Sequence, residues 1–163
     1  MTSALRTRLL TALTLASVIA LGAPPAVADD QSLRQAGKSR DAQFERLGKQ
    51  SRKLVRAWTR SDFKQARARP LLRNLKATRR ELDKVERALR AEEPSSEGGA
   101  TYKRLILRSL GHFDGSLRAQ LTGVRARTAG KKRAAAKAFR RADRLDALAA
   151  RDQKRAIDAY RSR

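Results

Sequence analysis

Residues 70–91 read PLLRNLKATRRELDKVERALRA, and this stretch decides the expected fold. Its large apolar residues recur at alternating spacings of four and three, about 3.5 residues per repeat, which is typical of a helix that buries one continuous stripe. A proline opens the stretch, and the first turn of a helix tolerates proline well. We therefore expect a helix over 70–93. Its buried stripe would consist of Leu71, Leu75, Thr78, Leu82, Val85 and Leu89.

Helical periodicity continues on both sides of this stretch. Upstream, it predicts a long first helix over 31–68, although two glycines weaken it and residues 59–62 could cap a restart. Downstream, the turn-forming residues 94–99 predict a loop, followed by a third helix over 101–128. An Ala129-Gly130 stop then precedes a fourth, alanine-rich helix over 131–162. The upstream stripe consists of Phe44, Leu47, Ser51, Leu54 and Trp58, and the third stripe of Ile106, Leu110, Phe113, Leu117, Leu121 and Val124.

Four amphipathic helices joined by short loops favour antiparallel neighbours. The expected fold is therefore all-α, an antiparallel up-down bundle of about four helices that forms a single domain over 29–163. Its core would be thin, because only 27 Leu, Ile, Val, Phe, Trp and Tyr residues follow position 28. Their burial would roughly offset the conformational entropy of ordering the chain, and charge repulsion would weaken the bundle further.

The first 28 residues have the order and length of a secretory signal peptide. Arg6 and Arg8 precede an uncharged run over 9–21, and a small-residue site predicts cleavage between Ala28 and Asp29. The uncharged run is shorter than the ~20 residues that span a bilayer. We therefore expect a secreted or cell-envelope-associated protein with no membrane span after cleavage. Small animal extracellular domains usually carry disulfides, so a chain without cysteine favours a bacterial origin.

The chain has no cysteine and one histidine, which excludes disulfides, thiolate zinc sites and cysteine nucleophiles. His112 lies two residues before Asp114, but residues at this spacing do not face each other on a helix. No serine or second histidine is spaced to complete a nucleophile–base pair. We expect a surface histidine; a haem or metal ligand and a pH-sensitive contact are the remaining interpretations. The sequence predicts no enzyme, cofactor or metal site.

Three glycines interrupt the third expected helix. Gly111 and Gly115 form a GxxxG motif, and Gly123 follows two turns later. All three lie roughly opposite the apolar stripe, and each costs about 1 kcal/mol relative to alanine inside a helix. We therefore expect a kink or a frayed patch here rather than a close-packing face.

Charge is the feature that stands out most in this sequence. The net charge is +23, from 39 Lys and Arg against 16 Asp and Glu. Residues 115–142 contain nine basic side chains and no acid, and residues 46–80 contain thirteen with only Asp62 in opposition. A basic run also opens the fourth helix, where the helix dipole disfavours cations. The candidate anion-binding residues are Arg125, Arg127, Lys131, Lys132, Arg133, Lys137, Arg140 and Arg141.

Two functional hypotheses follow from these patterns. The first is an exported protein that binds a polyanion, such as nucleic acid, a phosphate-bearing wall polymer or anionic lipid, because phosphates attract Lys and Arg regardless of sequence. The second is a structural or interaction protein whose helices pair with a protein partner or with themselves, with the charge serving only solubility. An exposed seam over 71–89 would favour the second hypothesis. Trp58 occupies a core position, so base stacking is not expected.

Overall fold

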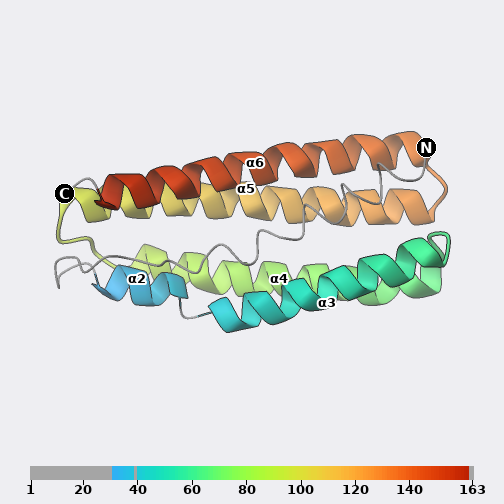
Figure 1. The fold of residues 1–163 in the computed structure, drawn as a ribbon, viewed down its shortest axis with the longest axis horizontal. Coiled ribbons are helices and arrows are strands. Elements are labelled where there is room, and N and C mark those ends of the chain that lie inside the picture. The colour runs from blue at the N-terminus through green and yellow to red at the C-terminus, as the bar shows by residue number, and fades with distance from the viewer. Residues whose placement is uncertain (1–30, 39, 162–163) are drawn as a thin grey trace.

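The computed structural model describes residues 31–38 and 40–161 (Figure 1). The expected signal peptide and its cleavage site lie outside these residues. The described residues form helices and connecting turns, with no strand. The helices are α2 (Gln31–Lys38), α3 (Asp41–Arg60), α4 (Gln65–Ala91), α5 (Glu97–Thr128) and α6 (Lys132–Arg161).

The four long helices run up, down, up and down along one axis (Figure 1). Helix α2 packs beside α4 and lies roughly in line with α3. Helices α2 and α3 together therefore occupy the position of the first helix of the bundle. The prediction of an all-α antiparallel four-helix bundle is confirmed. The turn at 61–64 between α3 and α4 and the turn at 129–131 between α5 and α6 lie at the same end of the bundle (Figure 1). We call this the turn end.

The predicted first helix over 31–68 is interrupted close to residues 59–62, where the sequence allowed a restart: α3 ends at Arg60, and residues 65–68 belong to α4. Between them, Asp62 and Phe63 have φ angles of 52° and 65°, in the left-handed region that ends a helix. Packing holds this turn in place, since the Phe63 ring lies edge-on against Trp58 with centroids 4.9 Å apart. Helix α4 thus begins five residues before Pro70, which lies inside it.

The third helix also begins earlier than expected, at Glu97 instead of 101. Ser96 has an extended backbone, and its hydroxyl oxygen accepts a hydrogen bond from the Gly99 N–H at 2.9 Å. This is the usual way in which serine caps a helix start. The turn-forming residues 94–99 are therefore divided between a short loop and the first turn of α5. The ends of α4 and α6 differ from the predicted ends by one or two residues.

The core follows the expected stripes closely. All six residues of the 71–89 seam are buried, with Leu82 and Leu89 completely inaccessible, and Phe44 and Trp58 of α3 are equally buried. On α3, however, Val55 is buried where Leu54 was expected, and Leu54 is only half-buried. The central cluster consists of Leu33, Phe44, Val55, Trp58, Ala68, Leu71, Leu75, Leu82, Val85, Leu89, Leu110, Leu117, Leu121, Val124, Ala135 and Phe139.

The glycines of α5 do not mark a kink or a frayed patch, and that prediction is wrong. Helix α5 buries a second face against α6, and two of the glycines lie on it. A Cβ atom at Gly123 would lie 2.5 Å from the Phe139 ring, and one at Gly115 would lie 3.2 Å from Leu145. Helix α6 is rich in alanine, whose small side chain allows close approach to α5. The apolar stripe of α5 alone did not indicate this contact.

Two alanine substitutions on α5 should therefore change stability in opposite directions. Gly111→Ala meets no atom within 4 Å, so it should stabilise the protein by about 0.5–1 kcal/mol through helix propensity. Gly123→Ala should destabilise it by about 1–2 kcal/mol, because overpacking against a buried ring outweighs that gain. Urea denaturation of both variants measures the difference. Equal stabilisation by both would contradict the close approach of α5 to α6.

Candidate anion-binding site

The two basic tracts of the sequence lie in the same half of the molecule. Residues 46–80 are centred on the turn at 61–64, and residues 115–142 are centred on the turn at 129–131; both turns lie at the turn end (Figure 1). Together they hold 22 Lys and Arg residues and one acid, Asp62. The rest of the chain from residue 31 to 161 holds 14 basic and 13 acidic residues. We call the region formed by residues 46–80 and 115–142 the basic half; the remainder is nearly neutral.

Seven of the eight candidate residues are exposed on this half. They have no ion-pair partner among the residues that the structure describes. Three of them open α6, where the unpaired backbone N–H groups of a helix start already carry partial positive charge. An anion at this position would meet both the side chains and the helix end. The seven residues are Arg125, Lys131, Lys132, Arg133, Lys137, Arg140 and Arg141.

Arg127 is the exception among the candidates. It is half-buried, and its guanidinium carbon lies 3.9 Å from the centroid of the Phe63 ring. This cation–π contact joins α5 to the turn between α3 and α4. Its Nε is buried without a hydrogen-bond partner. Arg127 therefore braces the two turns against each other, and its side chain is less available to a ligand than the other seven.

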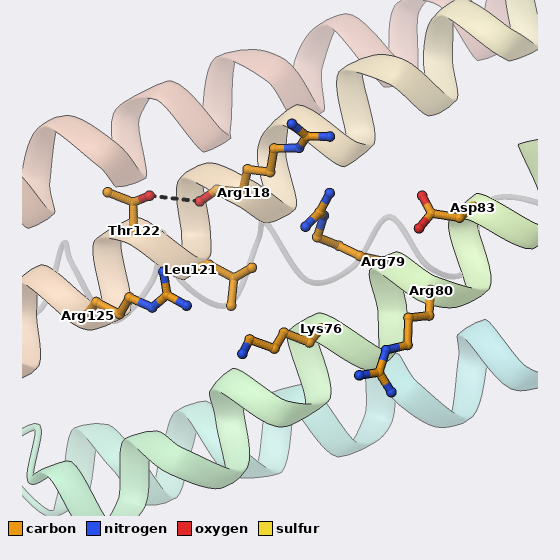
Figure 2. Close-up of a pocket in the computed structure, with 8 residues that line it drawn as sticks. All are labelled: Lys76, Arg79, Arg80, Asp83, Arg118, Leu121, Thr122 and Arg125. Atoms are coloured by element: carbon orange, nitrogen blue, oxygen red, sulfur yellow. Dashed lines mark hydrogen bonds between the residues drawn. The ribbon is translucent and has the colours of Figure 1, made fainter.

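A groove of about 400 Å³ runs between α4 and α5, and nearly all of its lining residues belong to the basic half (Figure 2). Five cationic side chains surround it, from both helices. No aromatic side chain lines it. We call it the α4–α5 groove. Its lining residues are Lys76, Arg79, Arg80 and Asp83 of α4, and Arg118, Leu121, Thr122 and Arg125 of α5.

One carboxylate orders two of the groove cations. The Nε atoms of Arg79 and Arg118 each lie 2.6 Å from a different oxygen of Asp114. This half-buried bridge joins α4 to α5 and holds both guanidinium groups in place. Lys76, Arg80 and Arg125 form no ion pair in the part of the chain that is described. The groove thus combines two positioned guanidinium groups with three unpaired cations.

His112, which the sequence predicted to be a surface histidine, is half-buried. It lies partly covered between α5 and α6, with Nε2 at 3.4 Å from an oxygen of the fully buried Asp152. Arg108 binds the same carboxylate through Nε at 2.6 Å and through a terminal nitrogen at 2.8 Å. These hydrogen bonds keep the pKa of Asp152 below its usual value. His112 therefore lies beside the Arg108–Asp152 ion pair that ties α5 to α6.

A second buried acid of α6 lies in the same interface. Asp146 is almost completely buried, and neither of its carboxylate oxygens has a hydrogen-bond partner of normal geometry. Burial raises the pKa of Asp146 to about 7, and repulsion from Asp143 adds to the rise, while the nearby Ser116 hydroxyl opposes it. Asp146 therefore carries a proton in mildly acidic solution. No sequence pattern distinguished this aspartate from the other acids of α6.

Sequence reasoning missed the groove. Of its eight lining residues, only Arg125 was a candidate. The others lie in or beside the basic tracts, but no spacing along the chain indicates that Lys76 and Arg125, 49 positions apart, flank one groove. That proximity depends on how α4 packs against α5.

No protein-family model matches the chain, and no curated protein or solved structure is detectably similar to it. None of the described helices is both long and apolar enough to cross a lipid bilayer. Among the described residues, no group of three or more His, Cys, Asp or Glu side chains is placed to hold a metal ion.

Proposed function

We propose that this protein is an exported polyanion-binding protein that contacts phosphate groups through its basic half. The observation that carries the proposal is that the two tracts, which hold 22 basic residues and one acid, lie at the same end of the bundle. Each phosphate that such a surface neutralises releases condensed counterions, which favours binding without sequence specificity. The expected signal peptide would bring this surface to polyanions outside the cell or within its envelope.

Two features favour this hypothesis over a helical interaction protein. The seam over 71–89 is buried in the chain's own core, so it offers no exposed stripe for pairing with another helix. The exposed residues opening α6 are Lys131, Lys132 and Arg133, a placement unfavourable to the isolated helix but favourable to anion binding. Trp58 is fully buried, so binding would depend on phosphate contacts and not on base stacking.

Neutralising the start of α6 should weaken binding without harming the fold. In Lys131→Gln/Lys132→Gln/Arg133→Gln, the slope of log affinity against log salt for duplex DNA should become shallower by about 2.7, at about 0.9 per lost phosphate contact. The melting temperature should hold or rise slightly, because the substitutions remove cations from a helix N-terminus. Fluorescence anisotropy at several salt concentrations and a thermal melt measure both effects.

A matched triple in the nearly neutral half provides the control. Arg104→Gln/Lys154→Gln/Arg155→Gln removes the same charge from exposed positions outside the basic half, and its salt slope should remain close to that of the unmodified protein. Equal effects of the two triples would contradict a localised binding surface. Failure of the unmodified protein to bind any polyanion would overturn the proposed function.

A further inference from the structure

The α4–α5 groove differs from the rest of the basic half because its cations face a common space. Figure 2 shows Lys76 extending from α4 and Arg125 from α5 into the space between the helices, with Leu121 between them. Both cationic side chains are exposed and without an ion pair among the described residues. An anionic group between them would be contacted from two helices at once, which a cation on a convex helix surface cannot achieve.

Asp114 prepares this groove for an anion. It binds Arg79 and Arg118 through their Nε atoms, and an arginine has five N–H donors, so four remain at the tip of each guanidinium group. Side chains that are already ordered lose less conformational entropy when they bind a ligand. The bridge therefore lowers the entropic cost of any contact that Arg79 or Arg118 makes with a bound strand, whereas the separate cations at the start of α6 lack such support.

The shape of the groove selects a narrow ligand. Packed helix axes usually lie about 8–10 Å apart, whereas the major groove of B-form DNA is by itself about 12 Å wide. A duplex is therefore too broad to enter between α4 and α5. A single flexible chain can lie there, and a groove of about 400 Å³ accommodates only a short part of it.

The lining of the groove selects the ligand's chemistry. Proteins that bind single-stranded nucleic acid by its bases stack them on aromatic side chains, and no aromatic residue lines this groove. Its cations can instead bind phosphate oxygens. Asp83 lies at the end of the groove away from Arg125 (Figure 2) and would repel a phosphate. The preferred phosphate position is therefore beside Lys76 and Arg125.

We infer that the α4–α5 groove is a subsite for one flexible phosphodiester strand, held by its phosphates between Lys76 and Arg125 and independent of any bases. This inference rests on the proposed function and narrows it, because the remaining basic surface binds any polyanion. Two sources share this chemistry: single-stranded nucleic acid and the polyol-phosphate polymers of cell walls.

Fluorescence anisotropy with four labelled probes tests the subsite. The probes are a short oligo(dT), the same strand made of abasic residues, a duplex of equal length and a poly(glycerol phosphate) chain. The unmodified protein should bind oligo(dT) and the abasic strand with affinities within about threefold of each other, because base stacking would add a much larger difference. Comparing the affinity for poly(glycerol phosphate) with the affinity for oligo(dT) then shows whether the groove prefers a wall-type polymer or single-stranded nucleic acid.

A groove variant and a matched control locate the binding. Lys76→Gln/Arg125→Gln should weaken binding of both single strands by about tenfold or more, through the loss of two charge-assisted contacts. Lys137→Gln/Arg141→Gln removes the same charges from exposed positions of α6 and should weaken it by less than about threefold, as expected for a diffuse contribution. Duplex binding should respond similarly to both variants. Circular dichroism should show an unchanged fold, because all four side chains are exposed.

Each unfavourable outcome has a separate meaning. Equal effects of the two variants on single strands would overturn the subsite while leaving the proposed function intact. The subsite would also be overturned if the groove variant weakened duplex binding as much as it weakened single-strand binding. A much higher affinity for oligo(dT) than for the abasic strand would overturn it as well. If the unmodified protein binds none of the probes, both the subsite and the proposed function are wrong.

Discussion

Leu82→Asp is expected to abolish the cooperative fold. Leu82 is completely buried in the middle of the α4 seam, in the cluster that joins α4 to the other helices. The substitution forfeits about 1.5–3 kcal/mol of apolar burial and adds several kcal/mol for a buried carboxylate without a partner. Natural domains have only about 5–15 kcal/mol of net stability, so the combined loss is comparable with the whole of it. Circular dichroism should show reduced helicity and no cooperative melting transition.

The exposed Arg73 of the same helix provides the control for this prediction. Arg73→Asp introduces the same side chain at a position that faces solvent, so helicity and melting temperature should stay close to those of the unmodified protein. If Leu82→Asp melted like Arg73→Asp, the seam would not lie in the core and the bundle would be wrong.

Raising the pH from about 4 to about 7 is expected to reduce stability, with Asp146 as the main cause. The pKa of this carboxyl group is raised from 3.8 to about 7 by its burial between α5 and α6. Across this interval the unfolded chain has lost the proton that the folded state keeps. The free energy of unfolding therefore falls as the pH rises through the window and stays low above it.

Asp146→Asn should remove most of this dependence. At pH 8 the variant should be more stable than the unmodified protein by up to a few kcal/mol, at about 1.4 kcal/mol per pKa unit. At pH 4, where the carboxyl group is protonated, the two should be nearly equal. Burial also raises the pKa of Asp41, to about 6, so a smaller slope of the same sign should remain. Chemical denaturation across the pH range measures both proteins, and parallel curves would contradict the assignment.

The helices were predictable because their stabilising pattern is local. A backbone hydrogen bond in an α-helix joins residues four apart, and the buried face repeats with the same short period. Leu75, Leu82 and Leu89 therefore indicated both the helix and its buried side. Residues 59–62 indicated where the predicted first helix could restart, but the geometry of the turn over 61–64 was not predictable in this way. Its positive-φ residues are held by Trp58 and Arg127, and Arg127 lies 64 positions away from Phe63 in the sequence.

The candidate site was predictable only in part, for a related reason. Seven of the eight candidate residues are exposed as expected, since charged side chains rarely become buried unless they are paired. Arg127 departs from the prediction because an aromatic ring from another turn covers it. The groove cations Lys76 and Arg79 were not among the candidate anion-binding residues, because the position of a basic residue along one helix does not indicate which other helix will face it.

The sequence by itself determined four amphipathic helices, their buried stripes and the strong excess of positive charge, since each depends on residue types at short, regular spacings. Only the tertiary structure decided that the two basic tracts share one half of the molecule and that Gly123 meets Phe139. It also decided that Asp114 joins Arg79 to Arg118 beside a groove. Gly123 and Phe139 are 16 positions apart in the sequence, and Arg79 and Asp114 are 35 positions apart. The formation of these contacts depends on how the helix faces pack, because helical periodicity specifies which side of each helix is buried but not which residues will meet across the interface.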